Sequence, residues 1–293
     1  MTPLARLAAA SAGLLSVLAL PALADSHPDA SRVLSLGGSV TEIVYALGQQ
    51  DRLIGRDTTS SFPAEVQALP DVGYVRALSP EGVLSVQPDL ILAEEGAGPP
   101  EAIAVLKEAG IPLETIPEGH DADGLAAKVE AVAEALGVAD AAGPVIDSLR
   151  ADLDKVTEVN RAAGEKKRVM FVLSLQGGRV MAGGEGSGGG AIIELAGAEN
   201  AVSGITGYKP LTDEAITAAA PDVIVMMSRG DPEADSGHGG SLAQLAGMPA
   251  LATTPAVRDG RVITMDGLLL LGFGPRTGQA ALQLHDAIYG ENG

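Results

Sequence analysis

The sequence predicts an α/β protein with two Rossmann-like lobes, each built on a mainly parallel sheet, joined by one long helix. Three observations predict this fold. A unit of helix, turn and strand occurs twice, short apolar strands alternate with helices, and a long amphipathic segment separates the two copies. Apolar strands alternating with helices are typical of parallel sheets covered on both faces. The length of 293 residues suits two such lobes.

Residues 1–24 have the features of a secretory signal peptide. One positive charge, Arg6, precedes an apolar run that closes with Pro21 and the small-x-small tripeptide 22–24. A membrane anchor needs about 20 apolar residues, more than this run offers. We therefore expect cleavage after Ala24 and export to the periplasm. Because the sequence contains no cysteine, neither lipid attachment through a thiol nor a disulfide is possible.

The charge balance narrows the possible partners. Nineteen Lys and Arg side chains face 38 Asp and Glu, which gives a formal net charge of −19 at pH 7. Nucleic acid and anionic membrane surfaces repel such a chain, so neither is an expected partner. No later stretch is long and apolar enough to span a bilayer, so no stable membrane insertion is expected either. The acidic balance does not choose among small ligands.

The repeated unit occurs at residues 78–93 (LSPEGVLSVQPDLILA) and 211–226 (LTDEAITAAAPDVIVM), a constant offset of 133. In each copy Ser79 or Thr212 stands where a helix N-cap is expected, and a Pro-Asp turn then leads into a short apolar strand. A second pair supports the first. Strand 32–36 with helix 43–48 is similar to strand 169–173 with helix 192–197, which favours duplicated α/β lobes.

The segment between the copies predicts a single helix over 140–165. Its apolar residues lie at helical spacing and charged residues fill the other faces. The expected organisation is an N-terminal lobe at 25–139, this linking helix, and a C-terminal lobe at 166–293. Ligands of open α/β sheets settle at the carboxyl ends of the strands, so the space between the lobes is the expected binding site. The apolar stripe of the helix consists of Ile146, Leu149, Leu153 and Val156.

A glycine-rich loop at 183–190 offers the strongest case for an enzyme. Gly184-x-Gly186-x-x-Gly189 follows a presumed strand and opens a helix, which formally matches a dinucleotide-binding fingerprint. No acidic residue ends a clear second strand about 20 residues later, as the ribose contact requires. A flexible loop at the rim of the binding site is the competing interpretation. A nucleotide-dependent exported enzyme stays open as an alternative, whereas isolated histidines and a missing Gly-x-Ser-x-Gly motif disfavour zinc and hydrolase chemistry.

One loop carries residues suited to oxidised iron. The stretch 70–76 (PDVGYVR) places Tyr74 two residues before Arg76, and both side chains point the same way if the segment is extended. A ferric ion and a nearby guanidinium both favour the phenolate form of tyrosine. The alternative is that Tyr74 packs on its own lobe and Arg76 is solvated. The spacing alone leaves both interpretations open.

The chain resembles the periplasmic haem-binding proteins of bacterial haem ABC importers, relatives of the vitamin B12 and siderophore binding proteins. The resemblance covers residues 32–289. Its general part is 39–42 (SVTE) and the two Pro-Asp units, and its haem-specific part is 62–65 (FPAE), 69–76 (LPDVGYVR), 265–267 (MDG) and 271–277 (LGFGPRT). The family is built as two lobes on a helical backbone.

The resemblance implies a ligand, site residues and partners. It implies that the chain is not an enzyme but carries haem, as transported ligand, to an inner-membrane ABC permease and its ATPase. Tyr74 matches the axial ligand of the haem iron with Arg76 beside it, and Arg229 matches a residue of the second lobe that reaches the phenolate or a propionate. Glu81 and Glu214 match the glutamates that dock on the permease. We expect a monomer, with cobalamin or a ferric siderophore as alternative ligand.

Overall fold

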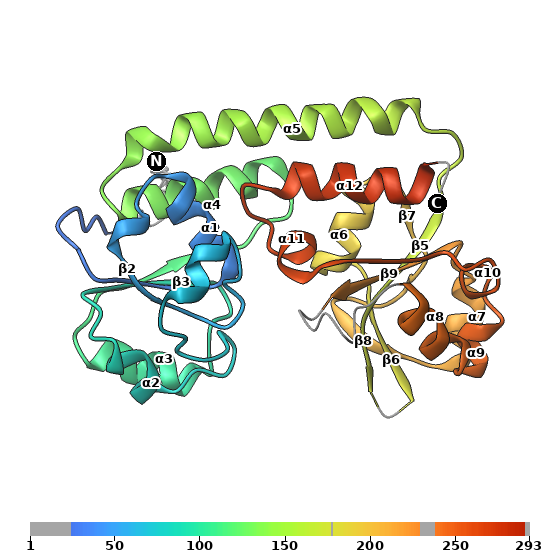
Figure 1. Ribbon diagram of the computed structural model, residues 1–293, viewed down its shortest axis with the longest axis horizontal. Coiled ribbons are helices and arrows are strands. Elements are labelled where there is room, and N and C mark those ends of the chain that lie inside the picture. The colour runs from blue at the N-terminus through green and yellow to red at the C-terminus, as the bar shows by residue number, and fades with distance from the viewer. Residues whose placement is uncertain (1–24, 177, 229–237, 291–293) are drawn as a thin grey trace, which may run out of the picture.

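The computed structural model describes residues 25–176, 178–228 and 238–290. The predicted signal peptide and Arg229 lie outside these residues. Within them, no helix has both the length and the apolar character needed to cross a membrane. Figure 1 shows two lobes side by side beneath one long helix, α5, at Ala142–Ala162.

The N-terminal lobe contains a four-stranded sheet in the order β2-β1-β3-β4, and its three strand pairs are all parallel. Alternate residues of a strand point to opposite faces of the sheet. Val33 belongs to the core on one face and Leu34 to the core on the other. The sheet is therefore buried on both faces, as continuous apolar strands predict. Its elements are β1 (Val33–Leu36), α1 (Gly38–Ala46), β2 (Leu53–Arg56), α2 (Pro80–Ser85), β3 (Leu90–Glu94), α3 (Pro100–Glu108), β4 (Leu113–Ile116) and α4 (Ala122–Ala135).

The C-terminal lobe is built on a six-stranded mixed sheet. Strands β10, β9 and β7 run parallel to β5, whereas β6 is antiparallel to both β5 and β8. Strands β5 and β6 form a hairpin. At the equivalent place beside β1, the N-terminal sheet has the parallel strand β2. The elements are β5 (Arg168–Gln176), β6 (Arg179–Gly183), α6 (Gly188–Leu195), β7 (Glu199–Asn200), β8 (Tyr208–Leu211), α7 (Asp213–Ala219), β9 (Val223–Ser228), α8 (His238–Ala246), α9 (Pro249–Ala252), α10 (Pro255–Arg258), β10 (Val262–Asp266), α11 (Gly267–Leu271) and α12 (Thr277–Tyr289).

The sheets reproduce the predicted internal repeat. Strand β1 pairs with β3, and β5 pairs with β9 in the same parallel sense. The helices ahead of β3 and β9 begin as expected, because the hydroxyl of Ser79 accepts from the amide of Gly82 and that of Thr212 accepts from the amide of Ala215. Each hydroxyl satisfies an amide that would otherwise have no partner in the first turn of the helix.

Helix α5 joins the two lobes along its length. Ile146 belongs to the core under the N-terminal sheet, whereas Leu149, Leu153 and Val156 belong to the core of the C-terminal lobe. The long helix is thus confirmed, within a few residues of its expected ends. Its apolar stripe therefore packs first on the N-terminal lobe and then, further along the helix, on the C-terminal lobe.

The lobes also meet away from α5. Leu125, in the first turn of α4, is a member of the C-terminal core although its helix belongs to the N-terminal lobe. Helix α12 packs along α5, and the segment before α12 reaches the N-terminal lobe (Figure 1). Contacts of α5, α4 and the segment before α12 therefore hold the two lobes together.

Candidate ligand site at the lobe junction

The loop that carries Tyr74 is fixed to the carboxyl end of the N-terminal sheet. The amide of Val72 donates to the carbonyl of Arg56 at 2.9 Å, and the amide of Thr58 donates to the carbonyl of Gly73 at 3.0 Å. The stretch before Tyr74 therefore lies beside the end of β2. Val75 is buried and anchors the loop, whereas the ring of Tyr74 is 48% exposed. A large, half-exposed aromatic ring on an anchored loop is available to a ligand.

Tyr74 and Arg76 lie in a tight turn. The amide of Ala77 donates to the carbonyl of Tyr74 at 2.8 Å, so the premise of an extended segment is wrong and alternation does not align the two side chains. The turn forms because Leu78 and Val75 are both bonded to the backbone of Gly98. Arg76 points toward the loop after β4, where its guanidinium lies 3.7 Å from the Glu118 carboxylate. Arg76 is thus held by an exposed ion pair.

A largely buried acid lies at the same carboxyl edge of the N-terminal sheet. Glu94, at the end of β3, covers the backbone of Gly37, where φ is +118° and any side chain would collide with the carboxylate. Burial, together with the negative charges of Glu118 and Asp57, raises the pKa of Glu94 to about 7, although Lys128 and Arg76 act in the opposite direction. The site therefore contains a carboxyl group that exchanges its proton near neutral pH.

A buried lysine joins the two lobes at the same edge. Lys128, on α4, is 2% exposed, and its ammonium donates to the Ser39 hydroxyl at 3.4 Å and to the Phe273 carbonyl at 3.3 Å. Burial lowers its pKa, although the charges of Glu118 and Glu94 favour the protonated form. The carboxyl end of the N-terminal sheet is therefore a polar surface that contacts the C-terminal lobe directly.

The C-terminal lobe presents Tyr208 toward this surface. Its hydroxyl accepts from the amide of Gly189 at 3.0 Å. Burial raises the pKa of Tyr208, and the charges of Arg76 and Glu118 act on the same hydroxyl from the other lobe. Tyr208 was missed in the sequence, although Gly73-Tyr74 and Gly207-Tyr208 both precede the repeated helix, with positive φ at each glycine. That shared dipeptide was the available signal.

The glycine-rich loop is closely packed at Gly184 and Gly189, which argues against flexibility at these two positions. A Cβ atom on Gly184 would lie 2.4 Å from the Ile205 carbonyl oxygen, and one on Gly189 would lie 2.4 Å from the Phe171 ring. Nor does the loop suit a dinucleotide. The preceding strand β6 is antiparallel to both neighbours, and the amides that open α6 are already bonded to Tyr208 and Ser187.

The remaining predicted residues lie elsewhere. Glu81 and Glu214 are exposed in the first turns of α2 and α7, which belong to separate lobes (Figure 1). Hydrogen bonds from its own amide and from the Thr212 hydroxyl lower the pKa of Glu214. Arg229 follows the last residue of β9 but lies outside the described residues. Among the predicted site residues that the structure describes, Tyr74 and Arg76 thus share one turn at the junction, and Glu81 and Glu214 lie on other elements.

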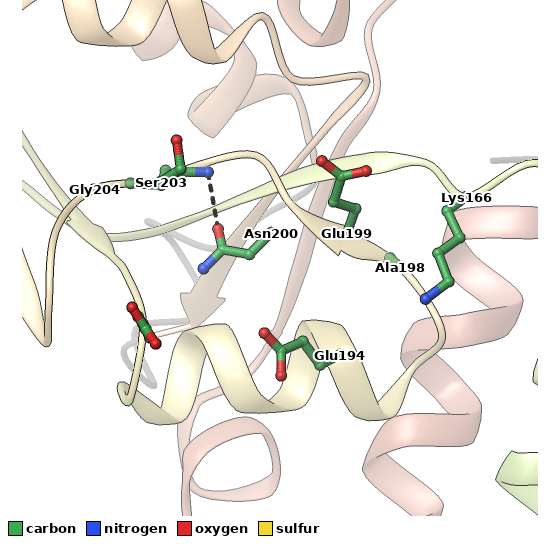
Figure 2. Close-up of a pocket in the computed structure, with 9 residues that line it drawn as sticks. Lys166, Glu194, Ala198, Glu199, Asn200, Ser203 and Gly204 are labelled. Atoms are coloured by element: carbon green, nitrogen blue, oxygen red, sulfur yellow. Dashed lines mark hydrogen bonds between the residues drawn. The ribbon is translucent and has the colours of Figure 1, made fainter.

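A surface pocket on the C-terminal lobe offers a different environment. Figure 2 shows Glu194 of α6 facing Glu199 of β7, with Lys166 at one end. The volume is about 560 Å³, and Asn200 on its wall accepts from the amide of Val202 at 3.0 Å. No group of three His, Cys, Asp or Glu side chains in the described part of the chain is arranged to hold a metal ion. This pocket contains none of the predicted ligand residues.

Two helix-joined α/β lobes with a ligand-facing junction define the class of substrate-binding proteins. The chain belongs to the periplasmic binding protein family, which matches residues 33–268. Members of this family are transport proteins that bind a substrate and not enzymes, so the nucleotide-dependent enzyme considered from the glycine loop is rejected. Within ABC importers, such proteins work together with a permease and an ATPase.

Several solved structures share the fold over nearly their whole length. The periplasmic heme-binding protein BhuT, in complex with two hemes, is 41% identical, with a TM-score of 0.80 over 88% of this chain and 97% of BhuT. RhuT from Roseiflexus sp. RS-1, in apo form, is 36% identical, with a TM-score of 0.82 over 88% and 98%. A periplasmic heme-binding protein from Pseudomonas aeruginosa is 34% identical, with a TM-score of 0.81 over 89% and 94%.

Sequence relatives point less narrowly to one ligand. An uncharacterized ABC transporter substrate-binding lipoprotein of Bacillus subtilis, YvrC, is 28% identical over 261 residues, which is 88% of this chain and 80% of YvrC. A vitamin B12-binding protein of Yersinia pestis is 38% identical, but over only 105 residues, 36% of each chain. These comparisons leave the transported substrate to be argued from the site.

Proposed function

We propose that the protein binds ferric haem at the junction of its lobes and delivers it to an ABC permease. The observation that carries this proposal is the half-exposed Tyr74, anchored on the carboxyl edge of the N-terminal sheet beside Arg76, in a chain whose relatives of known structure include haem-binding proteins at 34–41% identity. A phenolate is a hard oxygen donor, which suits ferric iron.

The surroundings of Tyr74 support its proposed role as axial ligand. Arg76 supplies a positive charge on the same turn as Tyr74, and Tyr208 of the other lobe lies within reach of that charge. Haem is a large apolar plate with two carboxylates, so burial of its faces should supply most of the affinity. Coordination by Tyr74 then supplies the preference for iron. We assign Arg229 a contact with the phenolate or a propionate.

Cobalamin or a ferric siderophore is the alternative ligand, favoured by the partial match to a vitamin B12-binding protein. A titration distinguishes the candidates. Purified protein receives haemin, cobalamin or a ferric siderophore in separate experiments, each followed by absorption spectroscopy and calorimetry. The proposal requires saturable haemin binding with a phenolate-type high-spin ferric spectrum. Saturable cobalamin or siderophore binding without a haemin response would overturn it.

The remaining proposals concern export and docking. We assign residues 1–24 to a signal peptide removed after Ala24, which leaves the chain free in the periplasm as a monomer. Lobes at 25–139 and 166–293 flank the linking segment 140–165. Glu81 and Glu214 are exposed carboxylates on matching helices of the two lobes, so they can form ion pairs with basic residues of a permease. N-terminal sequencing of the exported protein tests the cleavage site.

A further inference from the structure

The segment between α11 and α12, residues 272–276, crosses from the C-terminal lobe to the N-terminal lobe, and we call it the strap. Its Arg276 donates to both carboxylate oxygens of Glu42 on α1, one of them at 2.9 Å. The same guanidinium lies 3.6 Å above the ring of Phe62. The Glu42 side chain is 5% exposed, and its burial raises its pKa although the hydrogen bond and charge of Arg276 lower it. This is a desolvated, two-pronged ion pair between lobes.

Phe273 makes the second contact of the strap. Its ring packs against the imidazole of His120 with centroids 4.3 Å apart, and its carbonyl accepts from Lys128 of α4. Phe273 has a φ of +48°, an unfavourable backbone region for a bulky residue, yet its ring is only 4% exposed. Such a conformation persists where the surroundings over-determine it. The strap is therefore held in one geometry by contacts with both lobes.

The strap also touches the ligand-facing surface of the C-terminal lobe. A Cβ atom on Gly188 would lie 3.0 Å from the Phe273 ring and 3.6 Å from the Tyr208 hydroxyl. The Phe273 ring thus lies between His120 of one lobe and the loop that positions Tyr208 in the other. Any change in the angle between the lobes must disturb these contacts.

We propose that Arg276 and Phe273 are positioning residues that set the gap between the Tyr74 and Tyr208 surfaces. Helix α5 and the strap form a two-point joint, so the lobes do not swing about α5 alone. A gap of fixed width favours a flat, rigid ligand over a bulky one. The consequence for ligand choice rests on the proposed function, whereas the fixed gap does not.

Distance measurements test the joint without any ligand. Because the chain contains no cysteine, spin labels can be attached at Glu101→Cys on α3 and Ala218→Cys on α7, both exposed positions. Pulsed dipolar EPR then reports the distance between lobes. Arg276→Gln should broaden or shift this distribution, and Phe62→Leu, which leaves the ion pair intact, should do so less. The control Lys155→Gln breaks an exposed pair with Asp152 within α5 and should change nothing.

Haemin titration of the same variants supplies the second readout. Arg276→Gln should weaken haemin binding about tenfold or more while the ferric spectrum of the bound state stays the same, since Tyr74 is untouched. An unchanged distance distribution in folded Arg276→Gln protein would overturn the proposal. If Arg276→Gln does not fold, Phe62→Leu and Arg276→Lys decide, because an unchanged distribution in both contradicts a joint at this position. If wild-type protein binds no haemin, the proposed function fails while the distances still test the strap.

Discussion

Asp89 and Asp222 occupy equivalent positions in the two lobes and make the same contact. The carboxylate of Asp89 accepts from the amide of Arg32, just before β1, and that of Asp222 accepts from the amide of Arg168, the first residue of β5, both at 2.9 Å. Each aspartate belongs to the Pro-Asp turn of the repeat and fixes the start of the neighbouring strand. The repeated dipeptide is therefore explained by a repeated hydrogen bond.

Replacing either aspartate should destabilise its lobe. Hydrogen bonds to a charged acceptor contribute about 1.5–3 kcal/mol, so Asp89→Ala and Asp222→Ala should each lower the free energy of unfolding by about that amount. Urea unfolding followed by circular dichroism measures the change. Asp123→Ala is the control, since its side chain is 97% exposed. Equal stability of all three variants would contradict the structural role.

Stability should fall as the pH rises from about 4.5 to about 7 because of Glu94. Its pKa of about 7 in the folded chain lies above the ordinary value of 4.5, so the folded state binds the proton more tightly between these pH values. Stability from this group is present at low pH and is lost as the pH approaches 7. Glu94→Gln should flatten the decline and gain about 2 kcal/mol at pH 8, after allowance for solvent screening.

Urea unfolding at pH 4.5, 6 and 8 tests the role of Glu94. The comparison must be between variants, because burial also lowers the pKa of His120, which adds its own pH dependence. Glu95→Gln, at the exposed next position, is the matched control and should keep the wild-type profile. Parallel profiles for Glu94→Gln and wild type would show that Glu94 is not the group responsible.

The glycine-rich loop should be intolerant of side chains. At Gly184 an added methyl group collides with the Ile205 backbone, so Gly184→Ala should cost about 2 kcal/mol or more. Gly164, just after α5, has open space around its Cβ direction and no positive φ, so Gly164→Ala should change the free energy of unfolding by less than about 1 kcal/mol. Thermal unfolding of both variants gives the comparison. Similar melting temperatures would mean that the loop is loosely packed after all.

Tyr74→Phe separates coordination from packing. The variant keeps the ring but loses the donor oxygen, so we expect normal folding, loss of the phenolate-type ferric spectrum and about tenfold or greater weakening of haemin binding, or about 1.4 kcal/mol. Reduction of the bound haem to the ferrous form should also weaken its binding to the wild-type protein, because a phenolate stabilises the oxidised iron. Tyr45→Phe on α1 is the control. If the ferric spectrum of Tyr74→Phe is the same as that of the wild type, another residue coordinates the iron.

Reversing the two exposed glutamates tests the docking proposal. The double variant Glu81→Lys with Glu214→Lys should abolish haem uptake by cells, because opposite charges across the interface become like charges. Haemin binding by the purified protein should be unchanged. Glu101→Lys, in the first turn of α3 on the same lobe as Glu81, is the control and should leave uptake intact. Loss of haemin binding would instead place the glutamates in the site or the fold.

The repeated elements were predictable because each copy carries its own cap, turn and strand. Other elements depend on distant contacts. Helix α1 was expected from Ile43 but begins at Gly38, because the Thr41 hydroxyl is buried in a hydroxyl network with Ser35 and Ser60, at 2.6 Å from each. Strand β8 contains Pro210, which is tolerated only because β8 is an edge strand of the sheet.

The site was only partly predictable for a similar reason. Tyr74 and Arg76 were found from composition and spacing, yet the turn that separates their directions depends on Gly98, more than 20 residues away. The motifs 39–42, 62–65 and 271–277 were noted individually. Nothing in their spacing indicates that Glu42, Phe62 and Arg276 meet in one interlobe contact. Pairings between distant loops follow from the folded geometry.

The position of Leu125 in the core of the opposite lobe limits how the molecule can be divided. A chimaera that exchanges lobes with a relative by cutting within α5 would separate Leu125 from most of the core cluster to which it belongs, Phe273 among its members. The shared core would then combine side chains from two parents that never evolved together. A workable exchange must carry the first turn of α4 and the residues from Phe273 to Arg276 as a matched set, whatever the ligand that the donor transports.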